Sequence, residues 1–217
     1  MKSILIIGMG RFGTFLAKKL VELKNDVMVI DKSRDIINSI AGDFQNAHIG
    51  DCTNEAVLRS LGVGNFDKCF VTIGENFQSS LEITSLLKEL GANYVISKAN
   101  REIQAKFLLR NGADEVVYLE RDMGEKLAIR HSLDNVFDYI ELTDEYSIYE
   151  VPVPEHWVGN SIASLGVRAK YNLNILAIKQ GTKTFPMPRP DQVFKLGEHV
   201  MVMGKSEDIK RFNGDQK

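Results

Sequence analysis

All five prolines of the 217-residue chain lie after residue 150, and none precedes it. Proline lacks the backbone donor that central strands and helix interiors need, so it collects at edges and in loops. The shift in composition marks a domain boundary, which we place between residues 134 and 135. We therefore expect one domain over residues 1–134 and a second, of different architecture, over residues 135–217.

In the proline-free part, short apolar runs alternate six times with segments whose apolar residues recur at helical spacing. The first pair is SILIIG (3–8), a buried strand, and RFGTFLAKKLVELKN (11–25), an amphipathic helix. The further expected strands cover residues 27–31, 47–51, 66–74, 93–99 and 114–120, and the further expected helices cover 33–42, 53–62, 75–91 and 101–112. Because right-handed crossovers place helices on both faces of such a sheet, we predict an α/β fold with a Rossmann-like doubly wound parallel sheet.

Residues 121–137 read as one more helix, after which the pattern changes. Short strands with few helices between them are expected over residues 138–142, 146–153, 174–179, 182–187 and 199–204. This pattern predicts a small α+β domain in the C-terminal part of the chain.

The hexapeptide GMGRFG joins the first expected strand to the first expected helix. A lone GxGxxG is a weak signal, but in this strand–turn–helix setting it is typical of a nucleotide-binding turn. Gly8 permits the tight turn, Gly10 lets a pyrophosphate approach the backbone, and Gly13 lets the helix pack close to the strand. Asp31 ends the second strand, where a carboxylate can bind ribose hydroxyls and disfavours NADP. The alternative is a glycine turn that binds nothing.

Ligands of open α/β sheets bind at the carboxyl ends of the strands, so polar residues that end the other strands belong to the same candidate site. Asp51 ends the third strand and can accept from an adenine amino group or, alternatively, cap the next helix. The others are Gly74 and Asn76 after the fourth strand, Lys98 at the end of the fifth and Glu120 after the sixth.

Arg11 and Lys98 add two positive charges to a turn whose backbone amides already suffice for a pyrophosphate. Arginine binds phosphate oxygens with a fork of donors, so this pair favours a ligand with more negative charge than a dinucleotide, such as ATP or ADP. The alternative for Arg11 is a solvent-facing residue at the start of a helix.

The bulk properties exclude several classes of protein. The formal net charge is -2, without the basic domain typical of nucleic-acid binders, so no nucleic acid is expected as a partner. Cys52 and Cys69 lie in apolar stretches without metal-ligand spacing, which indicates buried, reduced thiols. No apolar run reaches the ~18 residues of a membrane span, and the first strand leaves no room for a signal peptide. We expect a soluble cytoplasmic protein.

No catalytic constellation is evident in the sequence. The C-terminal part contains only His156 and His199, with no acid–base partners beside them. Tyr94 and Lys98 have the YxxxK spacing of short-chain dehydrogenases, but on a strand such residues lie roughly 13 Å apart. GxxxxGK[ST] is absent, which excludes a P-loop ATPase. We expect a sensor rather than an enzyme; the alternatives are an NAD(H)-dependent oxidoreductase, an NADH redox sensor, or a structural ring subunit that binds no nucleotide.

Stretches throughout the chain, taken together, match one family: GMGRFG, VMVID, IGDCT, TIGEN, SKA, GAD, YLERDMG, DEYSIYEVPVP, VRAKYNLNILAIK and GKSEDIKRF. On these stretches the chain resembles the regulatory subunits of Ktr/Trk-type potassium transporters, which carry an RCK (also called KTN) domain, and is most similar to the KtrA/KtrC-like type. The resemblance implies a subunit that dimerises and forms an octameric ring beneath a membrane-embedded potassium-translocating subunit, at the inner face of the cell membrane. It also implies activation by ATP and inactivation by ADP.

The resemblance assigns site residues as well. It implies contacts to ATP, ADP or NAD(H) from Gly8, Gly10, Arg11, Phe12, Gly13, Asp31, Lys32, Asp51, Cys52, Ile73, Gly74, Asn76 and Lys98. Arg11 and Lys98 would face the terminal phosphates, and Glu120 matches a position that helps to bind a cation, such as Mg²⁺ or Ca²⁺, near the phosphates at the dimer interface. Alanine is common in the family where this chain has Cys52, which we expect to pack against the base.

In the family, the C-terminal domain can bind cyclic di-AMP at its own dimer interface, which inhibits the transporter. The matching positions are Arg168, Ala169, Lys170, Asn174, Ile175 and Pro190. Without the resemblance, the same stretch reads as a helix end and a core strand, with Arg168 and Lys170 in solvent.

Overall fold

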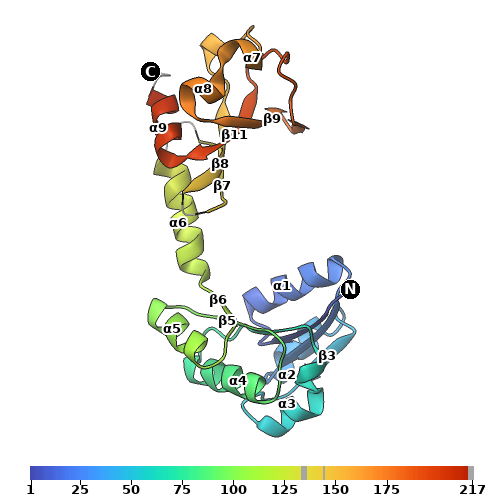
Figure 1. The fold of residues 1–217 in the computed structure, drawn as a ribbon. Coiled ribbons are helices and arrows are strands. Elements are labelled where there is room, and N and C mark those ends of the chain that lie inside the picture. Colours follow the sequence, from blue (N-terminus) through green and yellow to red (C-terminus); the bar gives the residue numbers. More distant parts are fainter. Residues whose placement is uncertain (133–135, 144, 215–217) are drawn as a thin grey trace. The chain divides into compact units, whose positions relative to one another are not determined.

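The computed structural model describes residues 1–132, 136–143 and 145–214. The chain divides into two compact units, Met1–Asp122 and Met123–Lys217, which Figure 1 draws from blue to green and from yellow-green to red. The boundary that the sequence predicts between residues 134 and 135 lies outside the described residues.

The first unit contains a six-stranded parallel sheet with the strand order β3-β2-β1-β4-β5-β6. Its strands are β1 (Ser3–Ile7), β2 (Asp26–Asp31), β3 (Asn46–Ile49), β4 (Lys68–Val71), β5 (Val95–Lys98) and β6 (Glu115–Val117). Its helices are α1 (Arg11–Glu22), α2 (Arg34–Ile40), α3 (Glu55–Leu61), α4 (Phe77–Glu89) and α5 (Glu102–Arg110), with a 3₁₀ turn, η1 (Val63–Asn65). The predicted doubly wound parallel sheet is confirmed.

The central strands are buried on both faces. In β1, Ile4 and Ile6 pack on the face covered by α1 and α2, whereas Leu5 and Ile7 pack with residues of α3 and α4 on the other face. This double burial explains why the strand reads as a continuous apolar run. β1 lies between β2 and β4, so the strand order reverses beside it, and a ligand crevice is expected at its carboxyl end.

The sixth strand is shorter than the sequence predicts. β6 ends at Val117, and Leu119 and Glu120 already belong to α6 (Leu119–Ser132). Glu120 and Asp122 lie in the first turn of this helix, where the helix dipole favours negative charge. The strand pattern of DEVVYLE therefore ends where these acids begin a helix.

The second unit contains a five-stranded antiparallel sheet with the order β10-β9-β11-β8-β7. Its strands are β7 (Asp138–Glu141), β8 (Tyr146–Pro152), β9 (Asn174–Gln180), β10 (Lys183–Pro186) and β11 (His199–Lys205). Its helical segments are η2 (Glu155–Trp157), α7 (Ile162–Leu165), α8 (Val167–Tyr171) and α9 (Ser206–Gly214). The predicted small α+β domain is confirmed, although α9 is not among the predicted elements.

An aromatic cluster forms the core of the second unit. Trp157 is 1% exposed, and its ring centroid lies 5.3 Å from that of Phe194, 5.2 Å from that of Phe212 and 6.3 Å from that of Tyr171. Phe212 and Ile209, both buried, are three residues apart on α9, so this helix is stabilised by the core that it closes. Within the described ranges, every helix is too short or too polar to traverse a lipid bilayer.

A charged cluster joins three strands of the same sheet. On β8, Tyr149 and Val151 point into the core, and Glu150 between them points to the opposite face. The Glu150 carboxylate, 8% exposed, accepts from Lys179 Nζ at 2.7 Å and shares a hydrogen bond with His199 Nδ1 at 2.8 Å. Burial opposes ionisation, but the hydrogen bonds and charges of the two partners outweigh it and lower the pKa of Glu150 below its ordinary value.

Replacing Glu150 by glutamine should lower the free energy of unfolding by about 1–2 kcal/mol at pH 7, because Lys179 and His199 lose the charge that they face. Since the folded-state pKa is lowered, the carboxylate contributes fully above its unfolded pKa of about 4.3, and the contribution is lost as the pH falls through the folded value. Urea unfolding at pH 7 and pH 3 measures the difference between wild type and Glu150→Gln, which should shrink at pH 3. A difference that is equal at both pH values would contradict this role.

Candidate functional site

The glycine turn leads from the end of β1 into α1 and leaves the start of the helix open. Gly8 has a φ of +97°, and a Cβ there would lie 2.9 Å from Ile73 Cγ1, so this position requires glycine. Gly10 is the N-cap of α1 and, as a glycine, has no side chain that could cap the first N–H groups of the helix. Chain neighbours apart, no atom of the described residues lies within 4 Å of the point where its Cβ would be. An anionic group can therefore approach the N–H groups of the first helical turn.

Gly13 is buried where α1 meets the sheet. A Cβ at Gly13 would clash with the carbonyl oxygen of Gly8 and lie 2.7 Å from Thr72 Oγ1. The Thr72 hydroxyl lies within hydrogen-bond distance of the carbonyl oxygens of Ile7, at 3.1 Å, and of Gly8. The start of the helix is thus held against β1 and against the residue that follows β4.

Asp31, the last residue of β2, fixes the turn from the neighbouring strand. Its Oδ2 accepts from the backbone N–H of Met9 at 2.7 Å, and its Oδ1 accepts from the backbone N–H of Ser33 at 2.8 Å. Each oxygen of an ionised carboxylate has a further lone pair, so Asp31 can still accept from ribose hydroxyls.

Asp51 follows β3 and uses one carboxylate oxygen for its own loop. Its Oδ1 accepts from the hydroxyl of Thr53 at 2.7 Å and from the backbone N–H of Thr53 at 3.0 Å. These two hydrogen bonds are the main reason that the pKa of Asp51 is lowered, and the charge of Lys32 adds to the effect. The N-cap of α3 is Asn54, whose side chain accepts from the N–H of Ala56. Asp51 therefore does not cap this helix, and the alternative role that the sequence left open for it is wrong.

The thiols are buried, as the sequence predicts. Cys52 is 3% exposed, and its burial, together with the charges of Asp51 and Asp31, raises its pKa to about 12. Cys69 is also buried, and neither cysteine is in a disulfide. Cys52 therefore places a neutral, apolar side chain next to the carboxylate of Asp51.

The other end of the sheet edge is formed by the segments after β4 and β5. Ile73 touches the glycine turn, and Gly74 follows it. Lys98 Nζ, at the end of β5, lies 3.4 Å from the point where a Cβ of Gly74 would be. Asn76 caps α4 by accepting from the N–H of Ser79 at 3.1 Å, which leaves its amide nitrogen to a ligand.

Two of the cations at this edge, Arg11 and Lys98, have no acidic partner among the residues that the structure describes; a third, Lys32, follows β2 and lowers the pKa of Asp51 by its charge. Arg11 is the exposed first residue of α1, and Phe12 beside it is half-buried. In the described part of the chain, no carboxylate lies within 4.0 Å of the charged nitrogens of Arg11 or Lys98. Both charges are therefore available to an anion.

Glu120 stands apart from these contacts. It is the exposed second residue of α6. Among the residues that the structure describes, no group of three or more His, Cys, Asp or Glu is arranged to hold a metal ion. A cation at Glu120 would need further ligands from phosphate oxygens, solvent or a second copy of the chain.

The YxxxK pair lies on an extended segment, as predicted. Tyr94 precedes β5 and Lys98 ends it. The hydroxyl of Tyr94 lies 3.3 Å from Glu115 Oε2, at the amino end of β6, whereas Lys98 is at the carboxyl end of the sheet. The two side chains therefore cannot act on one substrate.

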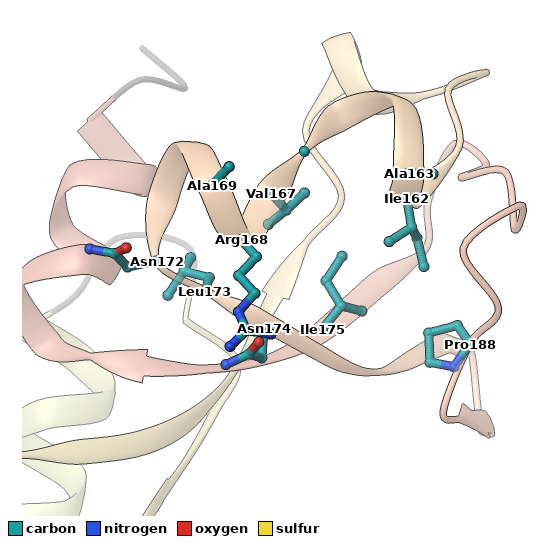
Figure 2. A pocket seen from close by; sticks show the side chains of 11 residues that line it. Ile162, Ala163, Val167, Arg168, Ala169, Asn172, Leu173, Asn174, Ile175 and Pro188 are labelled. Carbon is teal, nitrogen blue, oxygen red and sulfur yellow. The ribbon is translucent and has the colours of Figure 1, made fainter.

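The second unit contains a cavity of about 670 Å³ beside α7, α8 and β9 (Figure 2). Apolar side chains line much of it, namely Ile162, Val167, Leu173, Ile175 and Pro188. The larger polar residues in the lining are Arg168, Asn172 and Asn174. Figure 2 shows the side chain of Arg168 extending from α8 towards Asn174 on β9. Apolar walls with one guanidinium and amides suit a flat aromatic ligand that carries phosphate.

Four of the six positions predicted for this site line the cavity: Arg168, Ala169, Asn174 and Ile175. Lys170 and Pro190 are not in its lining. Lys170 Nζ lies 4.7 Å from the ring centroid of Tyr171, on which it makes a cation–π contact. The carbonyl of Pro190 accepts from the N–H of Ala163 at 2.8 Å, so it supports the cavity wall, and Pro188 takes the lining position.

Sequence reasoning misses several residues of both sites. Met9 contributes a backbone N–H and Thr72 a buried hydroxyl, and neither belongs to a recognisable motif. Pro188 and Asn172 are brought to the cavity by the fold of the second unit. Asn100 lies two residues after the end of β5, and the rule that ligands bind at strand ends could have found it.

Comparison with known proteins agrees with this architecture. The TrkA-N domain family matches residues 4–119, and the TrkA-C domain family matches residues 146–213. The chain is 40% identical over 211 residues to Ktr system potassium uptake protein C of Bacillus subtilis (strain 168), which covers 97% of this chain and 96% of that one. The chain belongs to the RCK-domain regulatory subunits of Ktr-type potassium transporters. The resemblance predicted from the sequence is confirmed.

Two further relatives carry similar names. Ktr system potassium uptake protein A of Bacillus subtilis (strain 168) is 38% identical over 214 residues, or 99% of this chain and 96% of that one. Ktr system potassium uptake protein A of Vibrio alginolyticus is 27% identical over 208 residues, or 96% of this chain and 94% of that one.

Solved structures show the same fold. The GsuK RCK domain has a TM-score of 0.69 at 19% identity, over 98% of this chain and 47% of that one. The GsuK channel bound to NAD has a TM-score of 0.69 at 20% identity, over 95% of this chain and 38% of that one. This chain therefore spans less than half the length of those chains.

Gly13→Ala should lower the free energy of unfolding by at least about 2 kcal/mol, because the added methyl meets backbone at Gly8 rather than a side chain that can move. Gly10→Ala is the matched control. Its φ of -66° suits any residue and its surroundings are open, so the loss should stay below about 1 kcal/mol, the size of the N-cap preference for glycine over alanine. Urea unfolding measures both variants, and equal losses in the two would contradict the assigned roles of these glycines.

Proposed function

We propose that the chain is a nucleotide-sensing regulatory subunit of a potassium uptake transporter, activated by ATP and inactivated by ADP. The observation that carries the proposal is the open N-terminus of α1, at the same sheet edge as Arg11 and Lys98, two cations without a carboxylate partner among the described residues. The relatives named as Ktr system potassium uptake proteins support the class of transporter.

The nucleotide would lie along the carboxyl edge of the parallel sheet. Its phosphates would meet Gly10 and the first amides of α1, and its ribose would meet Asp31. Asp51 Oδ2, which has no hydrogen-bond partner in the described ranges of the chain, would accept from the amino group of adenine, whereas the carbonyl of guanine would be repelled there. The pKa of Asp51 is lowered from a value that is already acidic, so this carboxylate is ionised at neutral pH.

Discrimination between ATP and ADP would depend on the charge of one phosphate. Arg11 and Lys98 would bind the terminal phosphate, in the same subunit or across a pair of subunits. A ligand shifts a conformational equilibrium only by its difference in affinity for the two states. Charge-assisted contacts of about 1.5–3 kcal/mol each are large enough to supply that difference, and no bond in the nucleotide needs to be broken.

The competing candidate is an NAD(H) sensor or an NAD(H)-dependent oxidoreductase. Asp31 fits the ribose of a dinucleotide equally well. The GsuK channel was solved bound to NAD, and a GsuK structure was solved bound to ADP. This candidate requires tight NADH binding that does not depend on Arg11.

Arg11→Ala should bring the affinities for ATP and ADP close together by weakening ATP binding about tenfold, because the proposed partner of the guanidinium is the terminal phosphate, which ADP lacks. Isothermal titration calorimetry with ATP, ADP and NADH measures this. Lys19→Ala, which removes the same charge from the last turn of the same helix, is the control and should bind like wild type.

Unchanged discrimination between ATP and ADP in Arg11→Ala would overturn the role of this residue. Tight NADH binding with weak ATP and ADP binding in the wild type would favour the competing candidate. Binding of none of the three would indicate a structural ring subunit.

We also propose the assembly that the family resemblance implies. The subunit would dimerise, form an octameric ring and dock on the cytoplasmic side of a membrane-embedded potassium-translocating subunit. Glu120, exposed at the start of α6, would complete a site for Mg²⁺ or Ca²⁺ with phosphate oxygens at the dimer interface.

The cavity of the second unit supports a further regulatory ligand, cyclic di-AMP. Its apolar walls suit an adenine ring, Arg168 suits a phosphodiester, and Asn174 can hydrogen-bond the edge of the base. Its volume of about 670 Å³ lies within the range of small-molecule sites, about 300–1,000 Å³. The ligand would be shared between two copies of the cavity and would inhibit transport.

Arg168→Ala should weaken cyclic di-AMP binding at least about tenfold and leave ATP binding unchanged, because Arg168 lines the cavity of the second unit and does not belong to the proposed ATP site. Calorimetry with both ligands tests this. Arg211→Ala, which removes an arginine of the same unit that is paired with Asp208, should bind both ligands like wild type. Equal cyclic di-AMP binding by Arg168→Ala and wild type would rule out this cavity as the site.

A further inference from the structure

Asn100 occupies the corner between the ends of β4 and β5, and none of the roles above uses it. Its backbone N–H donates to Gln104 Oε1 at 3.0 Å, at the start of α5. Its side-chain nitrogen Nδ2 donates to the carbonyl oxygen of Gly74. Asn100 thus ties the segment after β4 to the segment after β5, on the edge of the sheet where the glycine turn lies.

The contact with Gly74 fixes the orientation of the Asn100 amide. Only the NH₂ group can face a carbonyl oxygen, because two oxygens would repel each other. The side-chain oxygen Oδ1 therefore points away from that carbonyl. Oδ1 is buried, and among the described residues it has no hydrogen-bond partner. A buried acceptor without a donor lowers the stability of the folded chain, so the presence of an asparagine at this position needs a physical reason.

The ammonium group of Lys98 is the nearby cation. Lys98 Nζ lies 3.4 Å from the point where a Cβ of Gly74 would be, and Asn100 Nδ2 and Oδ1 lie 3.6 Å and 3.9 Å from the same point. An amide oxygen attracts an ammonium group through its dipole and carries no net charge. Among the described residues Oδ1 accepts no hydrogen bond from Nζ, so it attracts the ammonium group through space and leaves its positive charge uncancelled, whereas a carboxylate at the same place would cancel it.

We propose that Asn100 is a positioning residue for nucleotide discrimination. The dipole of its Oδ1 attracts the Lys98 ammonium group and orients it for the terminal phosphate, although no hydrogen bond joins the two among the described residues, and its Nδ2 holds the Gly74 carbonyl. The proposal rests on the proposed nucleotide-sensing function. It adds that residue 100, which lies near the Lys98 ammonium group, must be neutral if the subunit is to distinguish the extra charge of ATP.

The test measures ATP and ADP affinities of the full chain by calorimetry for Asn100→Asp and Asn100→Ala. Asn100→Asp places a carboxylate beside Lys98 and should lower the ratio of ATP to ADP affinity by about fivefold, the size typical of one partly exposed charge interaction. Asn100→Ala keeps the charge of Lys98 and should weaken both nucleotides, with a smaller change in the ratio.

Asn93 offers a matched control at the other end of the same strand. Its side chain also donates to backbone carbonyls, those of Gly64 at 3.0 Å and Phe66 at 2.7 Å, but it precedes β5. Asn93→Asp and Asn93→Ala should keep the wild-type affinity ratio even where thermal unfolding shows a loss of stability. In a Lys98→Met background, Asn100→Asp should no longer change the ratio, which a merely structural role would not produce.

A wild type that does not distinguish ATP from ADP would overturn the proposed function and this inference with it. A wild type that does distinguish them, together with wild-type ratios in both Asn100 variants, would overturn this inference alone. The same holds if Asn100→Asp lowers the ratio equally with and without Lys98, or if the Asn93 variants lower it as much.

Discussion

The start of α1 is held tightly against the end of β1 while its first amide groups stay open to a ligand. Gly13 has no side chain, so the helix approaches the Gly8 carbonyl and the Thr72 hydroxyl directly. Asp31 accepts from the N–H of Met9 and fixes the turn from the neighbouring strand. These contacts leave the first-turn N–H groups and the positive end of the helix dipole to a ligand, and the rest of the site is arranged around them.

Apart from Lys32, which follows Asp31, the acids and the cations proposed to bind the nucleotide lie at different strand ends of the sheet edge. Asp31 and Asp51 lie at the ends of β2 and β3, where acceptors suit the hydroxyl and amino groups of a nucleoside. Arg11 and Lys98 lie at the start of α1 and the end of β5, where donors suit phosphates. Under the proposed function, this arrangement would favour an adenine nucleotide with its base beside the acids and its terminal phosphate beside Arg11 and Lys98.

The sequence predicts the fold well because local patterns determine it. Apolar runs buried on both faces, as in β1, require a parallel sheet covered by helices on both sides. Residues whose position follows from a strand end, such as Asp31, Asp51 and Lys98, are also predictable.

Roles that depend on the hydrogen bonds and packing of the folded chain are not predictable from local patterns. Whether Asp51 caps a helix or folds back on Thr53 depends on which neighbouring side chain competes for the cap, and Asn54 takes it. The cluster of Glu150 with Lys179 and His199 joins residues on three strands that only the antiparallel pairing brings together. In the cavity of the second unit, Pro188 rather than Pro190 lines the wall, and Pro190 lies in the turn closed by the hydrogen bond from the N–H of Gln192 to the carbonyl of Arg189.

A crystal structure of the full chain with ATP tests the central claim most directly. The account predicts that the phosphates lie on the first amides of α1, with Arg11 and Lys98 of the same or the paired subunit within ion-pair distance of the terminal phosphate and the adenine amino group on Asp51. Phosphates bound elsewhere, or a bound ATP with both cationic side chains turned into solvent, would contradict it.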